Sequence, residues 1–76
     1  MTKANFLSLL DELLELPPGT LGESDALEQH GWGSLAAVGF MALADERFGE
    51  APSPIDLAKC QTPGDLVALF HGRITP

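Results

Sequence analysis

The sequence predicts an all-α domain of the four-helix bundle type, with a short third helix and a long first loop. Apolar residues recur at three- and four-residue steps in separate segments, and no segment shows the strict alternation of a strand. Two further segments open with a hydroxyl residue, a proline and then an aspartate, which is a pattern typical of helix starts. Since a chain of 76 residues is the size of one small domain, we expect a single domain over residues 1–76.

The first predicted helix covers residues 3–16. Its apolar side chains form one stripe: Phe6, Leu9, Leu10, Leu13 and Leu16. The acidic residues of the segment lie off that stripe: Asp11, Glu12 and Glu15. Pro17-Pro18-Gly19 is expected to end the helix, because proline cannot continue the hydrogen-bond ladder.

Residues 17–33 form a long connection, and a loop of this length commonly has a function or some structure of its own. We expect one helical turn over residues 24–28. Leu21 and Leu27 are placed to anchor the connection to the core, and Trp32 is expected to be partly buried.

The second predicted helix runs from Ser34 to Phe48, with Gly49 as its C-terminal stop. It carries two apolar faces. The first is expected to face the core: Ala37, Phe40, Leu43, Ala44 and Phe48. The second is expected to stay exposed: Leu35, Val38, Gly39 and Ala42. An exposed apolar face in so small a domain is a candidate docking surface for a partner.

The last two helices are predicted from their first turns, Ser53-Pro54-Ile55-Asp56 and Thr62-Pro63-Gly64-Asp65. Each supplies a hydroxyl N-cap, a proline at the first helical position and a carboxylate in the first turn, which is a variant of the capping box. We expect a short helix over residues 54–60 and a final helix over residues 63–72. The final helix has this apolar face: Leu66, Val67, Leu69 and Phe70.

The composition argues against several kinds of partner and site. Eleven acidic residues against four basic ones give a formal charge of −7, which does not suit nucleic acid or an anionic membrane surface. Cys60 is the single cysteine, and together with His30 and His71 it matches no metal-ligand spacing, so we expect neither a disulfide nor a metal site. The chain has no signal-peptide layout and no apolar run of bilayer length, and we expect a cytoplasmic protein.

The most informative segment is Gly31-Trp32-Gly33-Ser34-Leu35, which places one hydroxyl where a glycine-rich loop becomes an apolar helix. This position leaves Ser34 exposed and close to the first N–H groups of the helix, which suit a phosphate. On position alone, the simpler interpretation is that Ser34 only caps the helix.

In this segment and in its helix layout, the chain resembles the acyl carrier proteins, which are small acidic four-helix domains with Asp-Ser-Leu at the start of the second helix. The resemblance extends over essentially the whole chain and includes the stretches at residues 42–49 and 62–67. It implies that Ser34 is the attachment point for 4′-phosphopantetheine, transferred from coenzyme A by a phosphopantetheinyl transferase. The thiol of that arm would hold an acyl or aminoacyl group as a thioester, and the carrier itself would not be an enzyme.

The resemblance also implies further partners, namely an acyl- or aminoacyl-loading enzyme and synthase, condensing or tailoring enzymes. Docking is expected on residues around the serine: Gly33, Leu35, Ala36, Val38, Gly39 and Ala42. Carriers of fatty-acid synthesis tend to have carboxylates on this face. Its apolar character here favours a specialised pathway, such as polyketide or non-ribosomal peptide assembly or a fatty-acid-like pathway, over housekeeping fatty-acid synthesis. It also favours partners that read shape and apolar contact more than charge.

Gly33 departs from the family pattern, because acyl carrier proteins have an aspartate there that caps the helix and helps the transferase recognise its target. Glycine is an acceptable N-cap, and peptidyl carrier proteins tolerate other residues at this position. Two alternatives to a modified carrier stay open. One is a carrier-like interaction module that is never modified, and the other is a small esterase or thioesterase with Ser34 as nucleophile.

Overall fold

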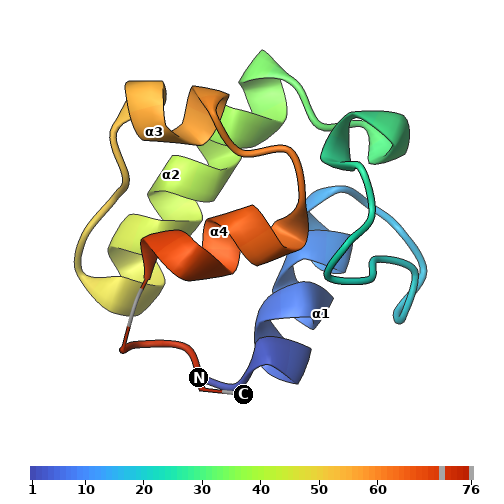
Figure 1. Cartoon of the computed structure of the whole chain (residues 1–76), viewed down its shortest axis with the longest axis horizontal. Helices are drawn as coiled ribbons and strands as arrows, with labels where there is room; N and C mark the ends of the chain where they lie inside the picture. The colour runs from blue at the N-terminus through green and yellow to red at the C-terminus, as the bar shows by residue number, and fades with distance from the viewer. Residues whose placement is uncertain (71, 76) are drawn as a thin grey trace.

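The computed structural model describes residues 1–70 and 72–75 and confirms an all-α fold. The described residues form four α-helices and one short 3₁₀-helix: α1 (Lys3–Leu13), η1 (Leu27–His30), α2 (Ser34–Phe48), α3 (Pro54–Ala58) and α4 (Pro63–Leu69). In Figure 1, α4 crosses the middle of the molecule, α3 lies at the upper left, and the first and last described residues lie together at the bottom. The predicted bounds of α2 are confirmed, including Gly49 in the left-handed conformation at its C-terminal end.

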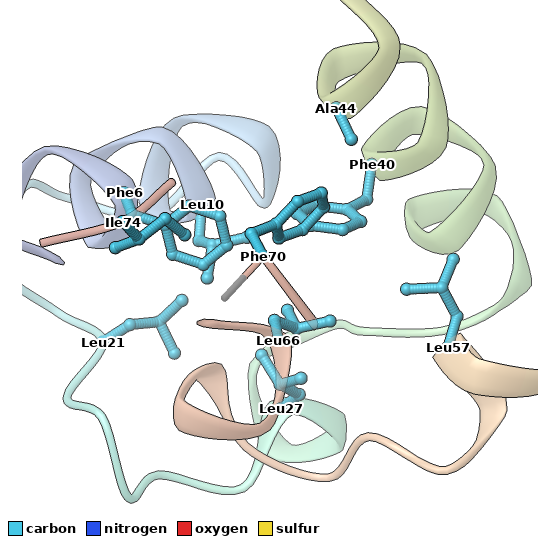
Figure 2. Close-up of a cluster of buried hydrophobic side chains, with 10 residues drawn as sticks. All are labelled: Phe6, Leu10, Leu21, Leu27, Phe40, Ala44, Leu57, Leu66, Phe70 and Ile74. Atoms are coloured by element: carbon cyan, nitrogen blue, oxygen red, sulfur yellow. The ribbon is translucent and has the colours of Figure 1, made fainter. Parts of the chain in front are cut away.

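The core draws one side chain or more from every α-helix and from the long connection (Figure 2). Its members are Phe6, Leu10, Leu21, Leu27, Phe40, Ala44, Leu57, Leu66, Phe70 and Ile74. The ring of Phe40 lies at the centre, with centroids 6.0 Å from Phe6, 5.9 Å from Phe70 and 5.8 Å from Trp32. The anchoring roles of Leu21 and Leu27 are therefore confirmed. The predicted core face of α2 is confirmed at Phe40 and Ala44, which are buried, and at Ala37 and Phe48, which pack against the core while half-buried. Leu43 is half-buried and is not part of this cluster.

The first helix ends at Leu13, three residues before the predicted boundary. Glu15 takes a left-handed conformation with φ of 58°. The Leu16 N–H then donates to the Asp11 carbonyl at 2.8 Å, and the Glu15 N–H donates to the Glu12 carbonyl at 3.1 Å. These two bonds form a Schellman motif, which satisfies the last carbonyls of the helix before the prolines are reached.

Asp11 lies off the apolar stripe of α1 and is nevertheless buried, with 2% of its surface exposed. Its carboxylate accepts hydrogen bonds from the Gly19 N–H at 2.9 Å and the Leu21 N–H at 3.0 Å. Asp11 therefore fastens the start of the long connection to α1, and it satisfies two backbone donors that the loop itself leaves unpaired.

The helical turn in the connection is the 3₁₀-helix at Leu27–His30, so the predicted turn over residues 24–28 is wrong in position. Asp25 instead closes a tight turn by accepting a hydrogen bond from the Gly22 N–H at 2.7 Å. An aspartate side chain that bonds to nearby backbone favours a turn over a helix.

Both predicted capping motifs form, although their helices are shorter than expected. The Ser53 hydroxyl accepts from the Asp56 N–H at 3.1 Å, and α3 ends at Ala58 instead of residue 60. Thr62 and Asp65 make a reciprocal capping box at the start of α4. That helix ends at Leu69 instead of residue 72, with Phe70 as its C-cap. His71, within the predicted helix, lies outside the described residues.

The chain ends are joined by backbone hydrogen bonds that the sequence does not predict. The Lys3 N–H donates to the Thr75 carbonyl, and the Thr75 N–H donates to the Met1 carbonyl, each at 2.8 Å. This isolated parallel bridge between Thr2 and Thr75 brings Ile74 into the core.

Candidate functional site

Ser34 is the first residue of α2 and is exposed to solvent. The turn that leads to it depends on Gly31, whose φ of 92° falls in the left-handed region that favours glycine. Gly33 is different, because its φ of −164° and ψ of −165° are extended backbone that any residue adopts. The position next to the serine therefore does not require glycine for its conformation.

No side chain caps the N-terminus of α2, whereas hydroxyl side chains cap the other three α-helices. The first backbone bond of the helix runs from the Ala37 N–H to the Gly33 carbonyl at 2.9 Å. The N–H groups of the first turn have no acceptor within a helix, and they carry the positive end of the helix dipole. The hydroxyl of Ser34 thus lies where a negatively charged group attached to it is stabilised.

A groove between α2 and α3 begins at Ser34 and has a volume of about 390 Å³. We call it the α2–α3 groove, and it is lined by Trp32, Gly33, Ser34, Ala37, Val38, Met41, Pro54, Leu57 and Ala58. None of these residues carries a charge. Trp32 is half-buried against Phe40, as expected, so the groove has a rigid aromatic wall.

A second groove lies between the end of α1 and the start of α2 and has a volume of about 540 Å³. We call it the α1–α2 groove, and it is lined by Leu13, Leu14, Glu15, Gly31, Leu35, Ala36, Val38 and Gly39. Four of the six predicted docking residues lie here: Leu35, Ala36, Val38 and Gly39. The contribution of α1 was not predicted, because periodicity within one helix does not show which helix lies beside it.

The exposed face of α2 agrees with the prediction at three of its four positions. Leu35 is 88% exposed, Val38 is 63% exposed, and Ala42 is also exposed. Gly39 differs, because it is half-buried and a Cβ added there would lie 3.1 Å from Leu13 Cδ1. Ile55 of α3, which the sequence did not single out, is 71% exposed, and its chain neighbour Pro54 lines the α2–α3 groove.

Cys60 is half-buried at the end of α3, and its Sγ donates to the Asp56 carbonyl at 3.5 Å. Burial raises the pKa of the thiol, and the carboxylates of Asp65 and Asp56 raise it further. The raised pKa disfavours the reactive thiolate, in agreement with a packing role.

Three further polar residues line neither of the two grooves. His30 is the half-buried last residue of η1, and Asp45 and Glu46 are exposed on α2. Among the described residues, no group of three or more metal-ligating side chains comes together. No described helix is long and apolar enough to span a membrane.

Comparison with known families settles the class of this chain. The family model described as the phosphopantetheine attachment site matches residues 5–70. The chain belongs to this carrier-domain family. Its members carry covalently attached 4′-phosphopantetheine, are generally not catalysts, and interact with the enzymes that modify and use them. Comparisons with curated proteins and with solved structures found no match.

The start of α2 fits such a group in three respects. Ser34 offers an exposed hydroxyl, the first turn of α2 offers N–H groups that no side chain occupies, and the adjoining α2–α3 groove offers an uncharged wall. When bound, the group supplies a flexible arm with a terminal thiol. The phosphate of the arm suits the helix N-terminus, and its neutral portion suits the apolar groove.

Proposed function

We propose that this chain is a carrier protein, formed as one domain over residues 1–76, in which the hydroxyl of Ser34 bears the 4′-phosphopantetheine arm. The observation that supports this most strongly is the exposed Ser34 hydroxyl at the uncapped start of α2, within a chain of the phosphopantetheine family. Transfer from coenzyme A joins the Ser34 oxygen to phosphorus. Adenosine 3′,5′-bisphosphate leaves, and the hydroxyl proton goes to a base of the transferase.

The cargo in this proposal is an acyl or aminoacyl group held as a thioester. The partners are a phosphopantetheinyl transferase, a loading enzyme and synthase or tailoring enzymes of a specialised pathway, such as polyketide or non-ribosomal peptide assembly. No carboxylate occurs between Glu28 and Asp45. This supports docking of partners on an apolar surface around Ser34, and the residues proposed for it are Gly33, Leu35, Ala36, Val38, Gly39 and Ala42.

The test is to incubate the protein with coenzyme A and a broad-specificity transferase and to measure its intact mass. We expect the wild-type protein to gain the mass of one phosphopantetheine and Ser34→Ala to gain none. Ser53→Ala is the matched control, because Ser53 is also an exposed hydroxyl next to a helix start. A wild-type protein that gains no mass contradicts the proposal, as does a Ser34→Ala protein that gains it.

An unmodified carrier-like interaction module is the second candidate, and Gly33 is the observation that favours it. In that case the protein isolated from its own host has no added mass, and its function survives Ser34→Ala. An esterase that uses Ser34 has less support, because a serine nucleophile needs a base within hydrogen-bond reach and no titratable side chain lines the α2–α3 groove.

A further inference from the structure

The α1–α2 groove combines an apolar lining with a single carboxylate. Its volume of about 540 Å³ lies within the range of roughly 300–1,000 Å³ found for ligand sites. Both helices supply apolar side chains to it, with Leu13 and Leu14 from the end of α1 and Leu35 and Val38 from the start of α2. Glu15 is the one charged residue in the lining, and it is exposed.

Glu15 occupies a backbone position that favours glycine. Its φ of 58° is left-handed, and it is the residue that closes the Schellman motif of α1. A side chain is disfavoured in this conformation, and residues held so are concentrated at functional sites. The carboxylate makes no ion pair with any residue that the structure describes. The fold therefore keeps a free negative charge at the edge of the groove, where glycine would have been less strained.

The floor of the groove is shaped by Gly39. Because this residue has no Cβ, α2 approaches the Leu13 side chain of α1 closely. On the outer side, Leu35 and Val38 project into solvent with 88% and 63% of their surfaces exposed. A shallow channel between two helices with apolar walls is the shape that accepts the apolar face of a third helix.

The charge of a candidate occupant decides whether the α1–α2 groove favours it. Two copies of this chain, each with four basic residues against eleven acidic ones and a formal charge of −7, repel each other, so a second copy is disfavoured as the occupant. A basic side chain is complementary to Glu15, and an arginine can form two parallel hydrogen bonds with its carboxylate. The sequence indicated recognition by shape and apolar contact more than by charge, and the structure adds one carboxylate, that of Glu15, to the lining of the groove.

We propose that the α1–α2 groove binds an amphipathic helix of a partner enzyme, with apolar side chains in the groove and an arginine or lysine paired with Glu15. This inference deepens the proposed carrier function and rests on it for the identity of the partner. The contact itself does not require the arm on Ser34. Binding of the helix and modification of Ser34 can therefore be measured independently.

The test uses a phage-displayed library of random peptides of roughly 16 residues, about four helical turns. The library is selected on the unmodified protein and on the transferase-treated protein. Enriched peptides are synthesised, their dissociation constants are measured by fluorescence anisotropy, and their site is mapped by amide chemical shifts. We expect peptides with an apolar helical stripe and a basic residue, and shifts centred on residues 13–15 and 35–39.

Variants test the role of the charge. Glu15→Arg is expected to weaken binding about tenfold or more, since facing charge pairs couple strongly. Glu46→Arg is the matched control, because Glu46 is exposed on α2 and does not line the groove, and it is expected to leave binding unchanged. A peptide whose basic residue is replaced by glutamate is expected to prefer Glu15→Arg over the wild-type protein.

Three results would overturn the inference: no peptide is enriched, the chemical shifts map to another surface, or peptides bind wild-type protein and Glu15→Arg equally. Circular dichroism checks that Glu15→Arg is folded. Glu15→Gly, which removes the charge and relaxes the turn, must lose the same preference for basic peptides. A chain that binds these peptides but gains no mass on Ser34 contradicts the carrier proposal and leaves the groove proposal intact.

Discussion

At the scale of single residues, Gly33 and Asp11 show how the environment of a residue determines its role. Gly33 precedes Ser34 and leaves the start of α2 without a side-chain cap, although its backbone would accept other residues. Asp11 is a carboxylate in the core that holds the loop by two backbone hydrogen bonds. We expect Gly33 to affect recognition by the transferase and Asp11 to affect the stability of the fold.

Gly33→Asp is expected to stabilise the protein and to speed its modification. A Cβ at this position meets no atom within 4 Å, and an aspartate there can accept from the free N–H groups of the first turn. The gain is about 0.5 kcal/mol, or roughly 2–4 °C in melting temperature. We also expect a higher kcat/KM with a broad-specificity transferase, because the resemblance to acyl carrier proteins implies that an aspartate here aids recognition.

Gly33→Ala tests whether the effect of Gly33→Asp comes from capping or only from replacing glycine. Alanine is a poor N-cap, so Gly33→Ala is expected to lower the melting temperature. A Gly33→Asp protein that melts no higher than the wild type would contradict the cap argument. An unchanged modification rate would show that the transferase does not read this position.

Asp11→Asn is expected to destabilise the fold by about 2 kcal/mol, because an amide cannot accept from both the Gly19 and Leu21 N–H groups. For a domain of this size the loss corresponds to roughly 8–16 °C in melting temperature. Glu12→Gln is the control, since it makes the same chemical change at an exposed position of α1 and is expected to shift stability by less than about 0.5 kcal/mol. Equal urea midpoints for the two variants would refute a structural role for the buried carboxylate.

At the scale of secondary-structure elements, the sequence predicts some helix ends correctly and others not. The bounds of α2 follow from a glycine on each side, and the starts of α3 and α4 follow from the hydroxyl-proline pattern, since these are local effects. The predicted end of α1 was wrong, because the chain leaves the helix through Glu15 in a left-handed conformation. This conformation is unfavourable for glutamate, so helix propensities do not predict it.

The same distinction applies to the site. The exposed position of Ser34 and three of the four positions of the exposed face of α2 could be predicted, because they depend on one helix and its first turn. The two grooves could not, since each needs a second helix whose side chains come from a distant part of the chain. The burial of Asp11 was missed for the same reason, because its partners Gly19 and Leu21 belong to the loop and not to α1.

Glu15→Gly is expected to stabilise the protein by about 1 kcal/mol, because it removes a Cβ from a left-handed residue at a helix end. Thermal unfolding should show a rise in melting temperature of roughly 4–8 °C. Glu12→Gly is the matched control and should be destabilising, since it places glycine inside the helix. If both variants lower the melting temperature, the left-handed turn is not a source of strain.

Asp65 makes the start of α4 sensitive to acid. The N–H groups of Gln61 and Thr62 donate to its carboxylate and lower its pKa in the folded protein below the ordinary value of 3.8. Because the folded pKa is the lower one, this contribution is fully present above pH 3.8 and is lost as pH falls through the folded pKa. The melting temperature of the wild type should exceed that of Asp65→Asn at pH 6, and the difference should shrink towards pH 2. A difference that does not vary with pH would rule out this linkage.

At the scale of the whole molecule, every helix contributes to one aromatic core, and the joined chain ends close it. The radius of gyration of the Cα atoms is 11.0 Å, close to the roughly 11 Å expected for a compact domain of this length. Phe48 stacks on Phe70 with centroids 4.5 Å apart, and Phe70 also contacts Phe40 and Phe6. With the interior filled by these rings, the grooves beside Ser34 lie on the surface, and no second core exists in the described residues to fold independently.

Phe40→Ala tests this dependence on a single core. Phe40 is fully buried, and removing its ring should cost about 3–5 kcal/mol. A domain of this size has a total stability of roughly 4–11 kcal/mol, so the variant should be partly or wholly unfolded at 37 °C. Val38→Ala, on the exposed side of the same helix, should leave stability within about 0.5 kcal/mol of the wild type.

The wild-type protein should unfold in one urea transition that is the same by circular dichroism and by Trp32 fluorescence, since the helices and the indole share the core. In Phe40→Ala both signals should be lost together, because no helix has a core of its own to remain folded on. Two separate transitions in the wild type would contradict the single-domain proposal. They would also mean that the α1–α2 and α2–α3 grooves could open without loss of the fold, since α1, α2 and α3 would no longer be held by the same set of rings.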